Sequence, residues 1–213
     1  MKVLIAGGGI GGLTTALGLA HAGIDVEVFE SVREPRALGV GINLQPNAVR
    51  ELTALGLGDT LAGVGVPLAQ LSMYNKLGQL ISSEPRGHSA GYHWPQYSIP
   101  RGQLQMSLLK TVQDRLGSQR MHTGHHLTAF DQDVDGVTAH FSDRNDDRGG
   151  GSAMRSVRGD VLVGADGIHS TVRAILHPEQ PETVFLGQLM WRGAAISPPF
   201  LDGRTMAIIG HRD

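Results

Sequence analysis

The residues best suited to chemistry in this chain are a run of glycines near the start and one acidic residue that follows it. Residues 7–12 read Gly-Gly-Gly-Ile-Gly-Gly, and Gly7, Gly9 and Gly12 occupy the three glycine positions of a GxGxxG motif. In dinucleotide-binding proteins these glycines allow a tight turn, close approach of a pyrophosphate, and close packing of a helix on a strand. Glu30 lies 23 positions after Gly7, near the ~20 expected for a carboxylate that binds ribose hydroxyls. The spacing predicts a dinucleotide site, with a glycine-rich turn that binds no ligand as the alternative.

The elements that would position these residues are a strand, a helix and a second strand. Residues 1–5 and 24–29 are short apolar runs typical of buried strands. Between them, apolar residues at helical spacing predict a buried helix face: Ile10, Leu13, Leu17 and Ala20. The N-terminal amides of that helix would point at the phosphates. A signal peptide would also combine Lys2 with an apolar stretch, but five glycines within residues 7–12 interrupt that stretch, so we expect a cytoplasmic protein.

A second acidic turn follows a predicted buried strand over residues 160–165. Asp166 and Gly167 come directly after this strand. Ligands of open parallel sheets bind beyond the carboxyl ends of the strands, so the Gly7 turn and the Asp166 turn could contact one ligand. Arg101 begins a predicted helix and could pair with the phosphates of that ligand.

The composition excludes several classes of chemistry. The 213 residues include no cysteine, which excludes disulfides, thiolate nucleophiles, iron–sulfur clusters and Cys-bound zinc. Redox chemistry must therefore come from a bound cofactor. A net charge of −2 argues against nucleic-acid binding, and no apolar run approaches the ~18 residues of a membrane span. His125 and His126 are adjacent, so on a strand they point to opposite faces and are poorly placed to chelate one metal ion.

The rest of the chain alternates predicted helices and strands with loops rich in glycine and proline. Helices are expected over residues 46–55 and 101–116, the second with Leu104, Leu108 and Val112 as its core face. Strands are expected over residues 71–75, 79–82, 120–123, 127–131 and 137–141, and a further strand is expected to begin within residues 188–195. Loops are predicted over residues 38–43, 84–100 and 143–151. Tyr92, Trp94 and Tyr97 gather in the second loop, where they either line a pocket or pack as ordinary loop residues.

Three motifs together resemble the flavin-dependent aromatic monooxygenases that have the para-hydroxybenzoate hydroxylase fold. They are residues 7–12 with Glu30, Arg101 with Leu104 three residues later, and the run from Gly164 to Arg173 that contains Ala-Asp-Gly. Four segments further resemble the phenazine-modifying branch of this family: residues 38–46, 83–87, 95–99 and 190–193. The resemblance covers essentially the whole chain. It implies an α/β fold in which a Rossmann-like FAD-binding βαβ unit is joined to a discontinuous, mainly antiparallel β-sheet domain for the substrate.

The resemblance also implies a reaction. In this family NAD(P)H reduces FAD, and the reduced flavin and O₂ form a C4a-hydroperoxide that hydroxylates an aromatic ring. The expected substrate is a small aromatic molecule, a phenazine-like carboxylate. The residues expected to contact FAD are Gly7, Gly9, Ile10, Gly11, Gly12, Glu30, Arg33, Val40, Gly41, Arg101, Leu127, Asp166 and Gly167.

Within this set the resemblance implies separate roles. Glu30 is expected at the adenosine ribose, residues 9–12 at the pyrophosphate, and the backbone of Leu127 near the adenine. Arg101 is expected at the phosphates or ribityl chain, residues 166–167 at the ribityl–pyrophosphate region, and residues 39–43 along the flavin ring. No catalytic acid or base is assigned, because the cofactor supplies the difficult chemistry.

The chain ends in an apolar run over residues 204–213 without a closing element, so we expect it to be a piece of a longer protein. Members of the family continue well beyond this length, with a Gly-Asp motif for FAD and much of the substrate pocket. The FAD domain is expected to comprise residues 1–65 and 99–177, and the substrate domain residues 66–98 and 178–213. Three alternatives stay open: an FAD-dependent dehydrogenase, reductase or oxidase of the same fold, an NAD-binding dehydrogenase, and a non-catalytic nucleotide-binding fragment.

Overall fold

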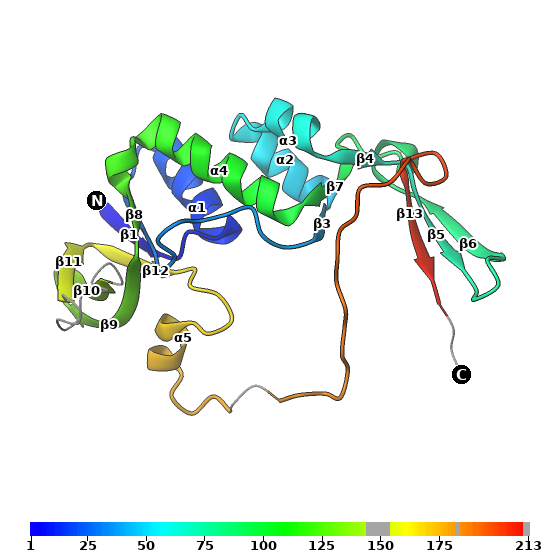
Figure 1. The fold of residues 1–213 in the computed structure, drawn as a ribbon. Coiled ribbons are helices and arrows are strands. Elements are labelled where there is room, and N and C mark those ends of the chain that lie inside the picture. The colour runs from blue at the N-terminus through cyan, green and yellow to red at the C-terminus, as the bar shows by residue number, and fades with distance from the viewer. Residues whose placement is uncertain (144–153, 182–183, 211–213) are drawn as a thin grey trace. The chain divides into compact units, whose positions relative to one another are not determined.

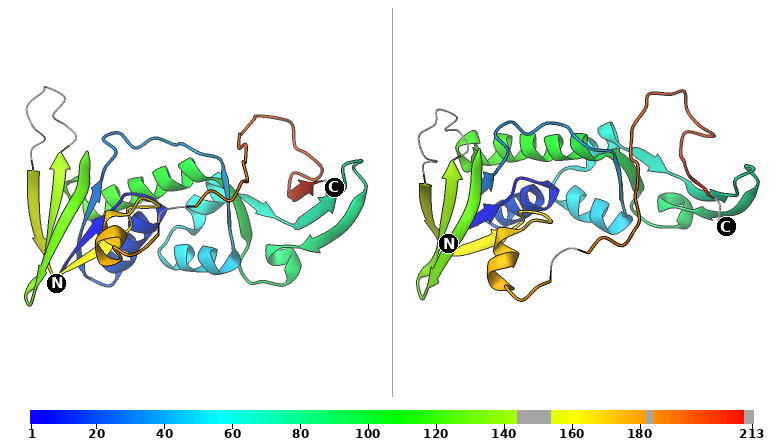
Figure 2. Two further views of the ribbon diagram at one scale, coloured as in Figure 1. Left: turned by 90° about the horizontal axis from the view of Figure 1, so that it is seen from below. Right: turned by 60° about the horizontal axis from the view of Figure 1, so that its bottom comes forward.

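The computed structural model describes residues 1–143, 154–181 and 184–210, so nearly all of the predicted loop at residues 143–151 lies outside the described part. The chain divides into two compact units (Figures 1 and 2). Unit 1 comprises Met1–Ala37 and Gln105–Met190, and unit 2 comprises Leu38–Leu104 and Trp191–Asp213. No helix in the described ranges is long and apolar enough to cross a membrane.

The centre of unit 1 is a parallel four-stranded sheet. Its strands, in order across the sheet, are β12 (Val161–Gly164), β1 (Lys2–Ala6), β2 (Asp25–Glu30) and β8 (Met121–Thr123). α1 (Ile10–His21) connects β1 to β2 and packs on both, which confirms the predicted strand–helix–strand unit. The buried face of α1 is centred on Leu13, Ala16 and Leu17. Ile10 and Ala20, in the first and last turns, are only half-buried, so the predicted face is right at its centre and wrong at its ends.

A three-stranded antiparallel sheet packs against one face of the parallel sheet. It consists of β9 (His125–Asp133), β10 (Gly136–Asp143) and β11 (Met154–Gly159). Apolar side chains of both sheets share one buried cluster: Leu4, Ala6, Phe29, Leu127, Ala139, Phe141 and Val157. The rings of Phe29 and Phe141 stack within it, with centroids 4.3 Å apart. The parallel sheet with its strand–helix–strand unit confirms the predicted α/β fold.

Two further helices complete the elements that matter for the site. α4 (Arg101–Leu116) follows the predicted bounds, and its predicted core residues Leu104, Leu108 and Val112 are all buried. Gly117, with φ +89°, ends this helix in a conformation that favours glycine. α5 (Thr171–Leu176) follows β12 after a short turn and packs on β9 and β12. A 3₁₀ turn, η2 (Ser118–Arg120), precedes β8.

Unit 2 contains two three-stranded sheets. One has the order β3 (Gly41–Leu44), β7 (Gln96–Pro100), β4 (Val66–Leu68) and is antiparallel; α2 (Pro46–Ala54) and α3 (Gly58–Val64) pack on its central strand. The other has the order β13 (Thr205–Ile209), β5 (Gln70–Tyr74), β6 (Leu80–Pro85), and η1 (Gly87–Ala90) is a 3₁₀ turn after β6. β13 pairs with β5 across more than a hundred residues of sequence, so the second sheet region is discontinuous, as predicted.

Three local predictions are wrong. Residues 41–44 form β3 and residues 96–100 form β7, although both stretches are predicted loops; the two strands pair with each other, so each gains its hydrogen bonds from a distant segment. No regular element begins within residues 188–195, where Trp191 is 91% exposed, because these residues pair with no described strand. α3 and β4 are not anticipated at all. The predicted division into an FAD domain and a substrate domain stays a prediction.

Candidate functional site

The site begins at the turn between β1 and α1, where the backbone is too crowded for side chains. Gly7 has φ +109°, and a Cβ there would lie 2.2 Å from the carbonyl oxygen of Ala165. A Cβ on Gly12 would lie 1.9 Å from the carbonyl oxygen of Gly7. At Gly9, by contrast, a Cβ would meet no described atom within 4 Å. The outer glycines are therefore required by the protein's own packing, whereas the middle one faces open space.

The N-terminus of α1 lies in this open space. Gly9 is its N-cap and has no side chain to bond the first amides, while the regular helix ladder starts with the amide of Leu13 donating to the Gly9 carbonyl at 3.0 Å. The amides of residues 10–12 precede that ladder and have no intrahelical acceptor. These donors and the positive end of the helix dipole together form a suitable site for a phosphate.

Glu30 lies at the end of β2 and holds the glycine turn directly. It is 9% exposed; its Oε2 accepts the Gly8 amide at 2.6 Å, and its Oε1 accepts the Val32 amide at 2.7 Å and the Ser31 hydroxyl at 3.1 Å. A carboxylate offers about four lone-pair directions, so these three bonds leave one for a ligand hydroxyl, on Oε2. Glu30 can therefore orient the turn and still bind a ribose hydroxyl.

Gln105 on α4 is a positioning residue that the sequence analysis misses. Its Nε2 donates to the carbonyl oxygen of Gly8 at 3.1 Å, so Gln105 and Glu30 bond the two ends of one residue's backbone. A Cβ on Gly8 would lie 2.7 Å from the terminal methyl group of Met121 and 3.0 Å from Oε2 of Glu30, so a side chain there would have to displace both. No sequence signal marks Gln105, since helix spacing alone does not reveal which distant carbonyl its side chain reaches.

Asp166 marks the second turn, at the end of β12. Its Oδ2 accepts the amides of Thr171 at 2.7 Å and Val172 at 3.3 Å, which caps α5. Its Oδ1 is buried and has no hydrogen-bond partner among the described residues. A buried carboxylate oxygen without a donor is costly, so this atom is suited to accept a hydrogen bond from a bound molecule.

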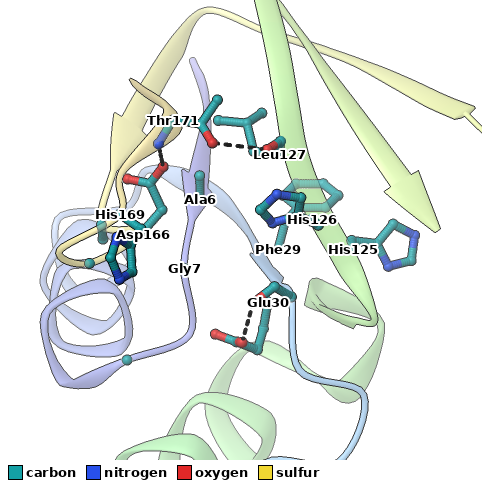
Figure 3. Close-up of a pocket in the computed structure, with 14 residues that line it drawn as sticks. Ala6, Gly7, Phe29, Glu30, His125, His126, Leu127, Asp166, His169 and Thr171 are labelled. Carbon is teal, nitrogen blue, oxygen red and sulfur yellow. Dashed lines mark hydrogen bonds between the residues drawn. The ribbon is translucent and has the colours of Figure 1, made fainter. Parts of the chain in front are cut away.

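A cavity of about 410 Å³ joins these parts (Figure 3). The predicted site residues that line it are Gly7, Gly9, Glu30, Leu127, Asp166 and Gly167. His125, His126 and His169 also line it, and Thr171 connects its two sides by donating from Oγ1 to the Leu127 carbonyl at 3.2 Å. In the sequence, His125 and His126 suggest at most a metal pair, and nothing marks them as residues that line a cavity. Among the described residues, no group of three or more His, Asp or Glu side chains could hold a metal ion.

The other predicted residues lie outside this cavity. Ile10, Gly11 and Gly12 belong to the first turn of α1, and Arg33 follows β2 within unit 1. Val40, Gly41 and Arg101 belong to unit 2, where the Arg101 amide donates to the Val40 carbonyl at 2.9 Å. Val40 and Gly41 line a separate cavity of about 400 Å³ in that unit.

His122 and Glu27 support Phe29, one of the aromatic residues that line the cavity. His122 stacks on Phe29, with ring centroids 4.6 Å apart, and bonds Glu27 through Nε2 at 2.9 Å. Burial lowers the pKa of His122, and this outweighs the opposite effect of Glu27. Burial alone would raise the pKa of Glu27, but hydrogen bonds from Lys2 and His122 lower it. His122 Nε2 therefore donates to the Glu27 carboxylate, and burial disfavours the protonated imidazole.

Comparison with known proteins identifies the family of this arrangement. The FAD binding domain family matches residues 1–200. Phenazine 1,6-dicarboxylic acid hydroxylase of Lysobacter antibioticus is 46% identical over 207 residues, which cover 97% of this chain and 50% of that protein. An FAD-dependent urate hydroxylase of Klebsiella pneumoniae is 31% identical over 91% of this chain and 47% of its own length.

Solved structures agree with the sequence comparison. A Klebsiella pneumoniae protein crystallised with FAD and uric acid has a TM-score of 0.67 and 31% identity, over 82% of this chain and 41% of that one. The chain spans about half the length of the curated relatives it matches. The predicted resemblance to flavin-dependent aromatic monooxygenases is thus confirmed. The chain belongs to the FAD-binding domain family, which confirms FAD as the predicted cofactor.

Proposed function

We propose that the whole protein is an FAD- and NAD(P)H-dependent monooxygenase that hydroxylates a polycyclic aromatic carboxylate. The observation that supports this most is the cavity of about 410 Å³ beside the glycine turn of unit 1. It combines the open N-terminus of α1, the Glu30 carboxylate and the unpartnered Oδ1 of Asp166. Phosphates, a ribose and a further hydroxyl-bearing segment are the groups that these three features would bind.

The residues present are suited to FAD. The amides of residues 10–12 would bind the pyrophosphate, and the vacant lone pair of Glu30 would take a hydroxyl of the adenosine ribose. Asp166 Oδ1 would accept a hydroxyl of the ribityl chain, with Gly167 beside it. Arg33, Arg101 and Leu127 are proposed as further contacts, and Val40 and Gly41 as residues along the flavin ring.

The proposed substrate follows from the relatives. The Lysobacter relative is named for a phenazine dicarboxylic acid, and the segments that resemble the phenazine-modifying branch occur throughout this chain. FAD, when bound, supplies electron transfer from NAD(P)H and activation of O₂. The proposed overall reaction converts ArH, O₂, NAD(P)H and H⁺ to ArOH, H₂O and NAD(P)⁺, where ArH is the aromatic substrate. The residues of this chain bind and orient the cofactor.

We propose a cytoplasmic location, and residues 1–65 and 99–177 as the FAD domain.

The test is the fate of molecular oxygen. Whole protein with bound FAD, NADPH and phenazine-1,6-dicarboxylate is incubated under ¹⁸O₂, and the product is examined by mass spectrometry. We expect a hydroxylated product with one ¹⁸O atom and one NADPH oxidised per product. NADPH oxidation that yields only hydrogen peroxide, or a product without ¹⁸O, contradicts the proposal and favours the FAD dehydrogenase, reductase or oxidase alternative. Colourless protein that binds NAD and cannot be reconstituted with FAD favours an NAD dehydrogenase.

A further inference from the structure

Unit 2 contains a second cavity, of about 700 Å³, which we call the α2 pocket because the N-terminus of α2 lines one side. It shares no lining residue with the cavity at the glycine turn of unit 1. Its wall combines cationic, aromatic and amide side chains: Arg50, Arg86, Tyr92, His93, Trp94 and Gln96. Of the two alternatives for the aromatic residues of this loop, lining a pocket or packing in the loop, each holds for some of them. Tyr97 is buried in the fold, whereas Tyr92 and Trp94 line the pocket.

Gln96 on β7 is the observation that points to a ligand. The residue is 5% exposed and lines the α2 pocket. Its backbone pairs with Leu68 on β4, but its side-chain amide forms no hydrogen bond with any residue of the described ranges. The amide nitrogen and oxygen of Gln96 are still accessible from the pocket, so they are available to bond a molecule that binds there.

The aromatic side of the pocket favours a flat ligand. The rings of His93 and Trp94 meet edge to face, with centroids 5.0 Å apart, and Trp94 is half-buried. The carbonyl of Tyr92 is held at 3.1 Å from Nδ1 of His88, which ties this loop to η1. Ring faces held in this way bind planar aromatic molecules by stacking.

The polar side of the pocket favours an anion. The Nη2 of Arg86 pairs with Glu84 at 2.8 Å, and its other N–H donors are not used by that bond. Arg50 lies on α2, whose N-cap Gln45 makes no side-chain cap, so the positive end of this helix dipole is uncompensated. A carboxylate is the planar anion that an arginine binds through two parallel hydrogen bonds.

We propose that the α2 pocket binds a planar aromatic carboxylate. Its ring lies against Trp94 and Tyr92, its carboxylate pairs with Arg86, and the Gln96 amide bonds a polar ring atom or a second carboxylate. The proposal rests on the proposed function only for the choice of ring system. Its test measures binding without turnover, so failure of the oxygenation reaction leaves it standing.

The test uses tryptophan emission in whole protein without FAD, with phenazine-1,6-dicarboxylate and uncharged phenazine as probes. We expect the dicarboxylate to quench emission in Trp191→Phe protein, and this quenching to be absent in Trp94→Phe protein. Arg86→Met should weaken dicarboxylate binding about 10-fold and leave phenazine binding unchanged, since a charge-assisted pair contributes roughly that much. Gln96→Leu should weaken dicarboxylate binding about 5-fold.

Arg36→Met is the matched control. Arg36 pairs with Glu34, two residues before it, at 3.0 Å, which is the same arrangement as Arg86 with Glu84 but outside the pocket. We expect this variant to bind the dicarboxylate within 2-fold of the parent protein. Equal losses in Arg36→Met and Arg86→Met, equal affinity for charged and uncharged rings, or quenching that persists in Trp94→Phe protein would each overturn the proposal. If Gln96→Leu does not fold, the Arg86 and Trp94 arms still decide it.

Discussion

β1 and β12 lie side by side in the parallel sheet of unit 1, and each runs into a glycine turn followed by a helix. After β1, the N-cap of α1 is Gly9, and the first amides of the helix have no side-chain acceptor. After β12, Asp166 accepts the amides of Thr171 and Val172, and the hydroxyl of Ser170 accepts the amide of Arg173 at 3.0 Å. The first amides of α1 are thus left without a side-chain acceptor, whereas the first amides of α5 are bonded by Asp166 and Ser170.

This difference assigns separate tasks to two similar turns. Open amides and a helix dipole attract a phosphate, which is why the pyrophosphate site is proposed at α1. The amides of Thr171, Val172 and Arg173 at the start of α5 are already bonded, so this helix start offers a phosphate no free donors. It offers an acceptor instead, the Oδ1 atom of Asp166, which suits a ligand hydroxyl. Variants at the two turns should therefore separate folding from binding.

Gly12→Ala should have the largest effect. The new Cβ would lie 1.9 Å from the Gly7 carbonyl, so the first turn of α1 cannot keep its position on β1. We expect a loss of about 3 kcal/mol or more in the free energy of unfolding, measured by urea denaturation, together with loss of FAD binding. Gly18→Ala in the same helix is the control; nothing described lies within 4 Å of its Cβ, so it should be neutral or slightly stabilising. Equal stability of the two variants would contradict the packing argument.

Gly9→Ala should separate binding from folding. A Cβ there meets no described protein atom, and φ of −76° suits alanine, so the free energy of unfolding should change by less than about 1 kcal/mol. The methyl group would instead occupy the space proposed for the pyrophosphate. We expect the Kd for FAD, measured by flavin fluorescence, to rise about 100-fold. Unchanged FAD affinity would show that the phosphates bind elsewhere.

The sequence predicts the open turn well and the closed turn poorly, for a physical reason. The roles of Gly7, Gly12 and Glu30 can be recognised in the sequence, because backbone crowding and strand-end geometry act within one local βαβ unit. The bond of Asp166 to α5 depends on the rotamer of a side chain five residues before Thr171, which spacing does not encode. The bond of Gln105 to Gly8 joins residues 97 positions apart, which a local pattern does not reveal. β3 and β7 are missed for the same reason, since each becomes a strand only by pairing with the other.

Asp166→Asn tests the acceptor at the closed turn. The asparagine oxygen can still accept the Thr171 amide, so α5 should stay capped. Its NH₂ group would replace the unpartnered Oδ1 with a donor, which cannot accept a ligand hydroxyl. We expect the Kd for FAD to rise about 10-fold with nearly unchanged unfolding free energy. An equal loss of stability and affinity would mean that Asp166 acts only as a cap.

Gln105→Leu tests whether the open turn needs its peptide held from α4. The change leaves the Gly8 carbonyl without its side-chain donor, and we expect the Kd for FAD to rise about 5-fold. Gln103→Leu is the matched control, because Gln103 lies in the same turn of α4 and is exposed. If both variants bind FAD equally well, the Gly8 peptide is held sufficiently by Glu30 alone.

Ser170→Ala should have the smallest effect. It removes the bond from the Arg173 amide at the N-cap of α5, a loss of about 1 kcal/mol in the free energy of unfolding or less, because α5 is short and also capped by Asp166. FAD affinity should stay within 2-fold, since the amides at this helix start do not face the phosphates in the proposed arrangement. A strong loss of FAD affinity in Ser170→Ala protein would show that both turns donate to the cofactor, and the contrast between them would no longer hold.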